Sequence, residues 1–433
     1  MEGWKRSKIG VVCNGFDTFE LKSVLTKNDA GDWGMEPDEN AVGVIRSTNF
    51  NNNGKLDLSD IAYRTLTPKK FSEKKLCASD ILIERSGGSE TQPVGRVGFI
   101  TDEMAKTDYA FANFIQRISL DDTVDAKFVY YCLQQMYEMG ITAGMQSQTT
   151  GIRNLDWKQY IKVSLPKPSL SEQTAIATLL SKVDEAIEAV QDSIAAAERL
   201  KKSLMQNLLT GKMKPDGTFR TPEEFYTDEK FGKVPLGWEI KRVNDLFYLN
   251  QNVLPNRTDS SYRFRYITIE SVNTESINFD NCDEFIFNES PGRARRIIKD
   301  GDILISGVRP NLKAFAIYRR PDSNNWICST GFHVLTAKEN VCSQFFFYQI
   351  LSSTGASQFH SWVSGSNYPA IGDNDMRKMK LYVPPYEEQL SINHCIECLI
   401  KIQIEKQTEI KTLMSLRKSL LQHLLLGVYQ VIK

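Results

Sequence analysis

The stretch KKSLMQNLLTG at Lys201–Gly211 returns, slightly changed, as RKSLLQHLLLG at Arg417–Gly427. When the chain is shifted against itself by 216 residues, 13 of the 40 positions from 172 to 211 are identical. Polar positions match as well as leucines, beginning with the Glu-Gln pair at Glu172. A shared composition would explain similar leucines, but it would not explain matching polar residues. The chain is therefore interpreted as two copies of one unit.

Each unit is expected to end in a long helix, over residues 169–212 and 385–428. Ser169, with a glutamate three residues later, forms a possible capping box at the start of the first helix. Apolar residues then recur at steps of three and four, which is a heptad seam. The second helix keeps the same frame, although Gln403 and Lys406 interrupt it. The residues expected to pair the helices are Ile176, Leu180, Val183, Ile187, Val190, Ile194, Ile392, Ile396, Leu399, Ile410 and Leu413.

A helix of about 40 residues is ~60 Å long, and an apolar seam along it needs a partner. The other helix of the same chain is the simplest partner, so we expect an intramolecular antiparallel coiled coil. Burial of the seam against the globular part of the protein is the alternative. Leu200 is expected to continue the apolar stripe toward Gly211, a plausible C-cap.

The segments before the helices contain short β-branched and aromatic runs separated by turn residues. DILIE at Asp80 and DILIS at Asp302 correspond to each other in the repeat. The expected fold class is α+β, with two tandem domains over 1–168 and 235–384, a linker over 213–234, and a pseudo-two-fold repeat. If the helices pair antiparallel, the two domains would lie at opposite ends of a rod.

Composition limits the class of protein. The 41% hydrophobic content is that of a folded globular chain, and the formal net charge is zero. The sequence shows no apolar run of membrane-spanning length. Eight scattered cysteines do not form a disulfide framework, so a cytoplasmic location is expected.

The sequence shows little that points to catalysis. VPPY at Val383–Tyr386 resembles the proline-rich loop of amino-methyltransferases, but that loop needs a side-chain oxygen at its first position. Cys395 and Cys398 form a lone CxxC, whereas a zinc site normally has four ligands, so they are expected to be small buried hydrophobes. We therefore expect a binding protein with no catalytic residues and no bound metal or cofactor.

Basic residues gather at two places that suit contacts with DNA phosphates. Residues 290–320 hold eight basic side chains against two acidic ones, and residues 64–85 hold six against three. A solvated surface is the alternative for any one of them. The DNA-contact candidates in these stretches are Arg64, Lys69, Lys70, Arg85, Arg293, Arg295, Arg296, Arg309 and Lys313.

A polar loop precedes the final strand of each domain, as GMQSQTTGIRN and WVSGSNYPAIGDN. Amide, hydroxyl and guanidinium side chains can read base edges, although they are also ordinary loop formers. The loops differ in sequence, as two different half-sites would require. The base-reading candidates are Gln146, Gln148, Thr149 and Arg153 in the first loop, and Ser364, Ser366, Asn367 and Tyr368 in the second.

The chain resembles the DNA-specificity subunit of type I restriction–modification enzymes. The resemblance covers almost the full length and rests on LPKPSLSEQTAIATLLSKVDEAI with RLKKSLMQNLLTGKM, on VPPYEEQLSI with LRKSLLQHLLLG, and on VPLGWE. It implies that each globular domain recognises half of a bipartite double-stranded DNA site. It also implies that the helices set the spacer between the half-sites and dock two methyltransferase subunits.

The resemblance further implies restriction and translocase subunits as partners, with S-adenosylmethionine, ATP and Mg on those partner subunits. Three other hypotheses remain open. The chain could be the recognition subunit of a related system that cleaves on both sides of its site. It could be a stand-alone enzyme whose site is not recognisable, or a coiled-coil scaffold that does not bind DNA.

Overall fold

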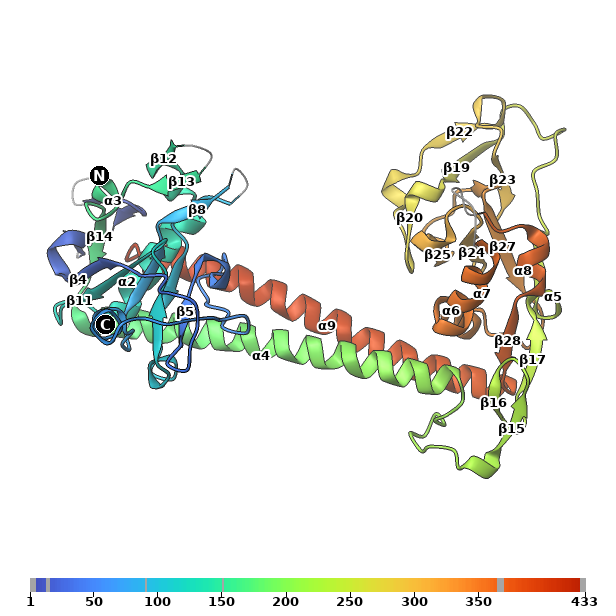
Figure 1. Cartoon of the computed structure of the whole chain (residues 1–433). Coiled ribbons are helices and arrows are strands. Elements are labelled where there is room, and N and C mark those ends of the chain that lie inside the picture. Colours follow the sequence, from blue (N-terminus) through green and yellow to red (C-terminus); the bar gives the residue numbers. More distant parts are fainter. Residues whose placement is uncertain (1–4, 13–15, 90–91, 150–151, 364–369, 429–433) are drawn as a thin grey trace. The chain divides into compact units, whose positions relative to one another are not determined.

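The computed structural model describes residues 5–12, 16–89, 92–149, 152–363 and 370–428 (Figure 1). The chain divides into two compact units. Unit 1 contains Met1–Asp192 and Thr408–Lys433, and unit 2 contains Ser193–Gln407. Each unit therefore holds one globular domain and one end of each long helix. None of the described helices is long and apolar enough to cross a membrane.

The long helices are α4 (Leu170–Leu209) and α9 (Tyr386–Leu424). The Ser169 hydroxyl accepts a hydrogen bond from the Glu172 backbone N–H at 3.3 Å, which caps the start of α4. In unit 1 the beginning of α4 packs near the end of α9, and in unit 2 the end of α4 packs near the beginning of α9. The two helices are therefore antiparallel, as the heptad seam predicts.

The helix-pairing candidates are all buried or half-buried. Ile176 and Leu180 share a core cluster with Leu421 of α9 and with the globular domain of unit 1. Ile392 and Ile396 lie in the corresponding cluster of unit 2. Part of the seam is thus buried against the opposite helix and the globular domain together, so both partners weighed from the sequence contribute to its burial.

Two expectations for the helices are wrong. Leu200 is 53% exposed, because the spacing change in this part of α4 turns it away from the paired face. Cys398 is exposed on α9 beside His394, while Cys395 is only half-buried. The described residues contain no group of three or more His, Cys, Asp or Glu side chains that could hold a metal ion.

Unit 1 is built on a four-stranded antiparallel sheet in the order β4-β11-β7-β9. A second sheet, β10-β5-β6, contains the parallel pair β10 and β5, and smaller sheets are β14-β3, β12-β13-β8 and β1-β2. The elements are β1 (Lys5–Ser7), β2 (Gly10–Val12), β3 (Asp17–Glu20), β4 (Leu25–Ala30), β5 (Val42–Ile45), β6 (Ala62–Arg64), α1 (Pro68–Lys74), β7 (Ile81–Glu84), β8 (Ser86–Gly88), β9 (Val97–Phe99), β10 (Tyr109–Phe111), β11 (Ile115–Leu120), α2 (Ala126–Glu138), β12 (Gln146–Thr149), β13 (Ile152–Leu155), α3 (Trp157–Tyr160) and β14 (Ser164–Lys167).

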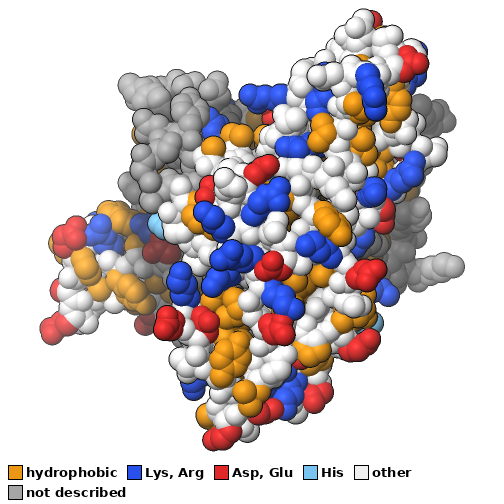
Figure 2. All heavy atoms as spheres, turned by 90° about the vertical axis from the view of Figure 1, so that its right-hand side faces the viewer, with side chains coloured by type: hydrophobic (Ala, Val, Ile, Leu, Met, Phe, Trp, Pro, Cys, Tyr) orange, Lys and Arg blue, Asp and Glu red, His pale blue; other side chains and the backbone are white. Residues whose placement is uncertain are grey.

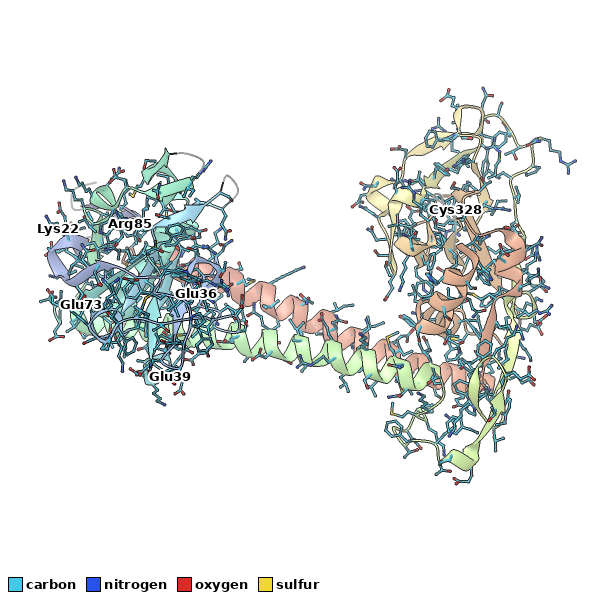
Figure 3. The ribbon with its side chains drawn as sticks, viewed as in Figure 1. Lys22, Glu36, Glu39, Glu73, Arg85 and Cys328 are labelled. Atoms are coloured by element: carbon cyan, nitrogen blue, oxygen red, sulfur yellow. The ribbon has the colours of Figure 1, made fainter. Side chains whose placement is uncertain are left out.

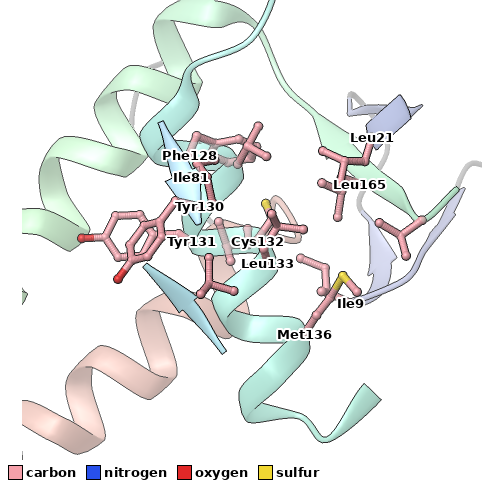
Figure 4. Packing of buried hydrophobic residues seen from close by; sticks show 14 of the residues in the cluster. Ile9, Leu21, Ile81, Phe128, Tyr130, Tyr131, Cys132, Leu133, Met136 and Leu165 are labelled. Carbon is pink, nitrogen blue, oxygen red and sulfur yellow. The ribbon is translucent and has the colours of Figure 1, made fainter. Parts of the chain in front are cut away.

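The core of unit 1 forms around α2, whose side chains from Phe128 to Met136 are buried (Figure 4). Ile81 of β7 and Leu165 of β14 belong to the same cluster. Because both long helices contribute to this cluster, the domain and the helix ends share one hydrophobic core. Each fully buried aliphatic side chain contributes about 1.5–3 kcal/mol.

Unit 2 repeats the plan with the antiparallel sheet β18-β27-β24-β25 and a second sheet, β22-β19-β26-β23, that contains the parallel pair β19 and β26. The elements are β15 (Phe225–Asp228), β16 (Gly232–Pro235), β17 (Glu239–Arg242), α5 (Val243–Leu246), β18 (Phe247–Leu249), β19 (Arg263–Ile267), β20 (Val272–Asn273), β21 (Ser276–Ile277), β22 (Glu284–Ile286), β23 (Ala294–Ile297), β24 (Ile303–Ser306), β25 (Phe315–Ile317), β26 (Trp326–Ser329), β27 (Phe332–Ala337), α6 (Ser343–Leu351), α7 (Ser353–Val363), α8 (Asp373–Lys378) and β28 (Lys380–Val383).

The main sheets of the two units have the same strand order. Of the four strands of each sheet, the one that comes last in the sequence, β11 or β27, lies between the first and the second. The same hydrogen bonds also recur at the helix starts. The side chain of Gln173 accepts from Asp125 N–H and donates to the Pro168 carbonyl. Gln389 accepts from Cys342 N–H and donates to the Pro384 carbonyl. The sequence repeat is therefore a repeat of structure.

The segment 213–234, expected to be a linker, contains part of a β-hairpin of β15 and β16. Met213 and Val234 from this segment join the core of unit 2. Arg220 binds Glu388 of α9 at 2.5 Å, and Trp238 donates to the same carboxylate at 2.9 Å. These contacts hold the connection between α4 and the second domain against the start of α9.

Candidate nucleic-acid interface

In both units, two loops meet. One follows β7 in unit 1 or β24 in unit 2, and the other is the polar segment that precedes β14 or β28. In unit 1, β8 pairs with β13, with Asn154 opposite Ser86. In unit 2, Val308 forms a bridge with Ala370. Two loops far apart in the sequence thus meet at the same place in each copy of the fold.

The unit 1 site surrounds Arg85, which directly follows β7 (Figure 3). Its guanidinium donates to the Gln116 side chain at 3.3 Å, and its carbonyl accepts from Leu155 N–H at 2.8 Å. The Ser86 hydroxyl donates to the Asn154 side-chain oxygen at 2.6 Å. A depression of about 380 Å³ next to these residues is lined by Arg85, Ser86, Asn113, Ser147, Asn154, Leu155, Asp156, Trp157 and Lys158.

The hairpin of β12 and β13 carries the remaining candidates of the first loop. Gln146 is half-buried, and within the described part of the chain neither atom of its amide has a hydrogen-bond partner. Arg153 is half-buried in β13, opposite Gln148 and Gly88. Gln148 and Thr149 lie in β12, but their side chains are outside the described part of the structure. The structure thus brings Arg85, Gln146 and Arg153 to one small sheet.

The other basic candidates of unit 1 lie elsewhere. Arg64 belongs to the sheet β10-β5-β6, binds Glu36 at 2.6 Å and covers the ring of Trp33 at 4.5 Å. Lys70 of α1 binds Asp32 at 2.5 Å, and this hydrogen bond lowers the pKa of the Asp32 carboxyl below its ordinary value. Lys69 is exposed on the same helix. Figure 3 labels Glu36, the partner of Arg64, and Arg85 at different places in unit 1.

These ion pairs oppose the charge of the basic residues, so the sequence stretch 64–85 does not form one positive surface. The sequence could not show this, because the partner carboxylates Asp32 and Glu36 come from a separate segment of the chain.

The basic stretch of unit 2 is divided between two sheets. Arg293 is exposed just before β23, and Arg296 is half-buried within it. Arg295 of β23 covers the ring of Phe287 at 4.7 Å and donates to the Ser290 hydroxyl at 3.3 Å. Figure 2 shows Lys and Arg side chains scattered among Asp and Glu on one face of this unit. The charge run in the sequence is therefore not a single patch in space.

Arg309 and Lys313 lie apart from that strand, in the loop between β24 and β25, and both are exposed. This is the loop that Val308 connects to Ala370. Ser364, Ser366, Asn367 and Tyr368 lie outside the described residues. The structure therefore brings two of the five basic candidates of unit 2 to the end of the polar segment.

Two polar contacts close to these loops in the chain had no signal in the sequence. In unit 1, Arg96 binds Glu84 at 2.7 Å, and both side chains are almost fully buried. In unit 2, the two ring nitrogens of His333 lie 3.0 Å from Asp373 and from the carbonyl of Ile371. Each contact joins residues that are distant in the chain, so no local motif marks it.

A duplicated α+β domain, each copy followed by a long helix and carrying a polar loop junction, is the architecture of a DNA-specificity subunit. The model of the type I restriction modification DNA specificity domain matches residues 1–199 and 235–413. The chain belongs to this family of type I restriction–modification specificity subunits.

Individual relatives agree with the family. The chain is 21% identical to the type I restriction enzyme MjaVIII specificity subunit of Methanocaldococcus jannaschii, over 84% of this chain and 82% of the relative. It is also 21% identical to the EcoKI specificity subunit of Escherichia coli K12, over 94% and 84%. The crystal structure of the type I restriction–modification S subunit from M. genitalium has a TM-score of 0.54 at 17% identity, covering 95% of this chain and 96% of that chain. At this identity the structural likeness shows a shared fold.

Proposed function

We propose that each globular domain of this specificity subunit binds one half of a bipartite double-stranded DNA site. The observation that carries this proposal is the loop junction, which recurs at the corresponding place in both units, as an antiparallel strand pair in unit 1 and as a single antiparallel bridge in unit 2, with different side chains. Unit 1 presents Arg85, Ser86 and Asn154 there, whereas unit 2 presents Val308 and Arg309. Because base pairs differ in the donors, acceptors and methyl groups at their edges, different polar and apolar side chains on one scaffold would favour different sequences.

We propose that the paired helices fix the number of base pairs between the half-sites. A helix rises ~1.5 Å per residue, so removing seven residues from each helix would shorten the pair by ~10 Å, or about three base pairs. Removing one heptad from each helix between its two ends keeps the seam in phase. The preferred spacer should then shorten by about three base pairs while both half-sites stay the same. A change in either half-site would contradict this role for the helices.

We propose that the helices also dock two methyltransferase subunits. Large apolar side chains remain exposed on them, including Leu200 in α4 and Ile402, Met414 and Leu416 in α9. A partner subunit that covers these side chains would remove their apolar surface from water, which is favourable. In this proposal the chain itself catalyses nothing, and S-adenosylmethionine, ATP and Mg act on the methyltransferase and restriction subunits.

The test is a map of methylated adenines in a host that expresses the chain together with its methyltransferase subunits. A split motif with a fixed spacer, absent when this chain is omitted, is the expected result. An active methyltransferase that modifies the same sites without this chain would overturn the proposal.

Two variants sharpen the map. Arg85→Ala should relax or abolish recognition of one half-site and leave the other unchanged, because Arg85 lies at the loop junction of unit 1 only. Lys106→Ala is the matched control, since Lys106 is an exposed basic residue of the same unit, in the 3-10 turn Met104–Lys106, and is not a DNA-contact candidate. Equal loss of both half-sites in the Arg85 variant would argue against one half-site per domain.

A further inference from the structure

The loop between β24 and β25 carries an exposed leucine between two cations. Leu312 is 65% exposed and Val308 is 41% exposed, whereas Pro310 between them is buried. Arg309 and Lys313 are both exposed at the two sides of the short 3-10 turn Pro310–Leu312. A large apolar side chain is thus presented to solvent in a strongly positive setting.

The backbone holds this loop in a defined shape. Arg309 and Lys313 have φ of +48° and +49°, a region that disfavours residues with a side chain. Leu312 N–H donates to the Arg309 carbonyl at 2.9 Å, and Lys313 N–H donates to the Pro310 carbonyl at 3.0 Å. The Thr274 hydroxyl donates to the Lys313 carbonyl at 3.1 Å. Glycine would avoid the strain at 309 and 313, but it would remove both cations.

The base of the loop is fixed to the end of the polar segment. Ile371 N–H donates to the Gly307 carbonyl at 2.8 Å, next to the bridge of Val308 with Ala370. His333 lies between the Ile371 carbonyl and the Asp373 carboxylate, at 3.0 Å from each. The exposed leucine therefore belongs to the same junction that the proposed function assigns to DNA.

Resting on that proposed function, we propose that Leu312 is an apolar wedge that enters between two stacked base pairs of the second half-site. Arg309 and Lys313 bind the flanking phosphates. DNA-bending proteins insert leucine, proline or similar side chains between base steps, with basic residues beside them. The segment of unit 1 that corresponds to Val308–Pro310 is Ser86–Gly88, and it carries no large apolar side chain.

A protein surface is the competing occupant. Lys313 also lines an apolar groove of about 380 Å³ with Met205, Leu209 and Leu351. Leu312 is not on the wall of that groove, and both cations beside it suit a polyanion. These two facts favour DNA.

The test uses the chain in complex with its methyltransferase subunits, and duplexes that carry 2-aminopurine at successive positions of the second half-site. The wild-type complex should raise the fluorescence at one base step. Leu312→Ala should remove most of that rise. It should also weaken site-specific binding about tenfold, because contacts of the leucine side chain would no longer offset the cost of unstacking the two base pairs. Leu312→Met should restore both. Arg309→Ala should lower the slope of log K against log salt by about one, whereas Leu312→Ala should leave it unchanged.

The control is Leu236→Ala, which removes a 59% exposed leucine from another loop of unit 2. No change of fluorescence at any position with the wild-type complex, or equal signals from wild type and Leu312→Ala, would overturn the wedge. Site-specific binding in that case would still support the proposed function, whereas its absence in wild type would overturn both. A Leu312→Ala variant that binds less methyltransferase would assign the residue to the protein surface instead.

Discussion

Arg417 is the residue that joins both long helices to the domain of unit 1. Its guanidinium binds Asp184 of α4 at 2.6 Å and Glu138 of α2 at 2.9 Å. The side chain is only 12% exposed, and the two carboxylates are 19% and 27% exposed. Burial alone would lower the pKa of Arg417, but the charges of Asp184 and Glu138 raise it above its ordinary value. Arg417→Met should leave two carboxylates without their shared cation.

The cost follows from this burial. Removing one partner of a buried ion pair costs about 3–5 kcal/mol, because a buried charge is left uncompensated. Asp184 also accepts from the Tyr131 hydroxyl, and Glu138 accepts from Gln134, so each carboxylate retains another donor. We therefore expect a loss near the lower end, about 3 kcal/mol. For a unit of this size, that loss lowers the Tm by about 6–12 °C.

Thermal unfolding of the full chain, with hydrogen exchange of the α2 and α6 amides, measures the effect in each unit. Protection should fall in α2 and remain in α6, because Arg417 contacts unit 1. Lys418→Met is the control, since Lys418 is the exposed neighbour on the same helix. Lys201, the counterpart of Arg417 in the repeat, donates to the neutral Gln403 amide oxygen at 3.3 Å, so Lys201→Met should cost less than about 1 kcal/mol. A cost below about 1 kcal/mol for Arg417→Met would refute this reasoning.

Three further predictions concern other parts of the chain. Gln173→Ala and Gln389→Ala should each cost about 2 kcal/mol in urea unfolding, because each leaves a backbone N–H and a carbonyl unpaired; the exposed Gln191→Ala should cost almost nothing. Burial lowers the pKa of Lys127 below its ordinary value of 10.5. Between the pKa of Lys127 in the folded chain and 10.5, the unfolded chain binds more protons than the folded chain, so the free energy of unfolding should rise with pH. A pH series of urea midpoints should show this rise in the wild type and not in Lys127→Met. Ile402→Glu should weaken methyltransferase binding at least about tenfold in a pull-down titration, whereas Gln407→Glu on the same helix should not.

The helices were predictable because a heptad seam is a local pattern, and the repeat was predictable because the chain can be compared with itself. A heptad seam is a regular spacing, and a 216-residue shift compares the chain only with itself. The sheets gave no such signal. The pairing of β4 with β11 joins Ala30 to Gln116, about half of the domain apart in sequence, and short mixed runs do not specify partners. The polar composition of segment 213–234 likewise gave no signal that Met213 and Val234 belong to the core of unit 2.

Part of the candidate site was predictable, because some polar residues chosen for their type also lie on strands or loops that the fold places next to each other. Arg85 and Arg153 are brought together because β8 and β13 pair. Counting charges along the chain misled, because Arg296 lies in β23 of one sheet, whereas Arg309 lies in the loop that follows β24 of the other sheet. It also ignored partners such as Asp32, which opposes the charge of Lys70. Polar contacts such as that of the buried His333 with the partly exposed Asp373 depend on the fold and lack a sequence pattern.

The interruption of the second seam gains a physical explanation from the same comparison. Gln403, which breaks the apolar pattern of α9, accepts from the Lys201 ammonium and donates to the Glu198 carboxylate, both at 3.3 Å. A single polar layer in a coiled coil lowers stability but penalises every register in which its partners are missing. A pair of helices whose length measures a DNA spacer requires one register, because a slip of one heptad would shift the measure by ~10 Å. Under the spacer-measuring role that we propose for the helices, the polar layer would fix their register rather than be a defect in the seam.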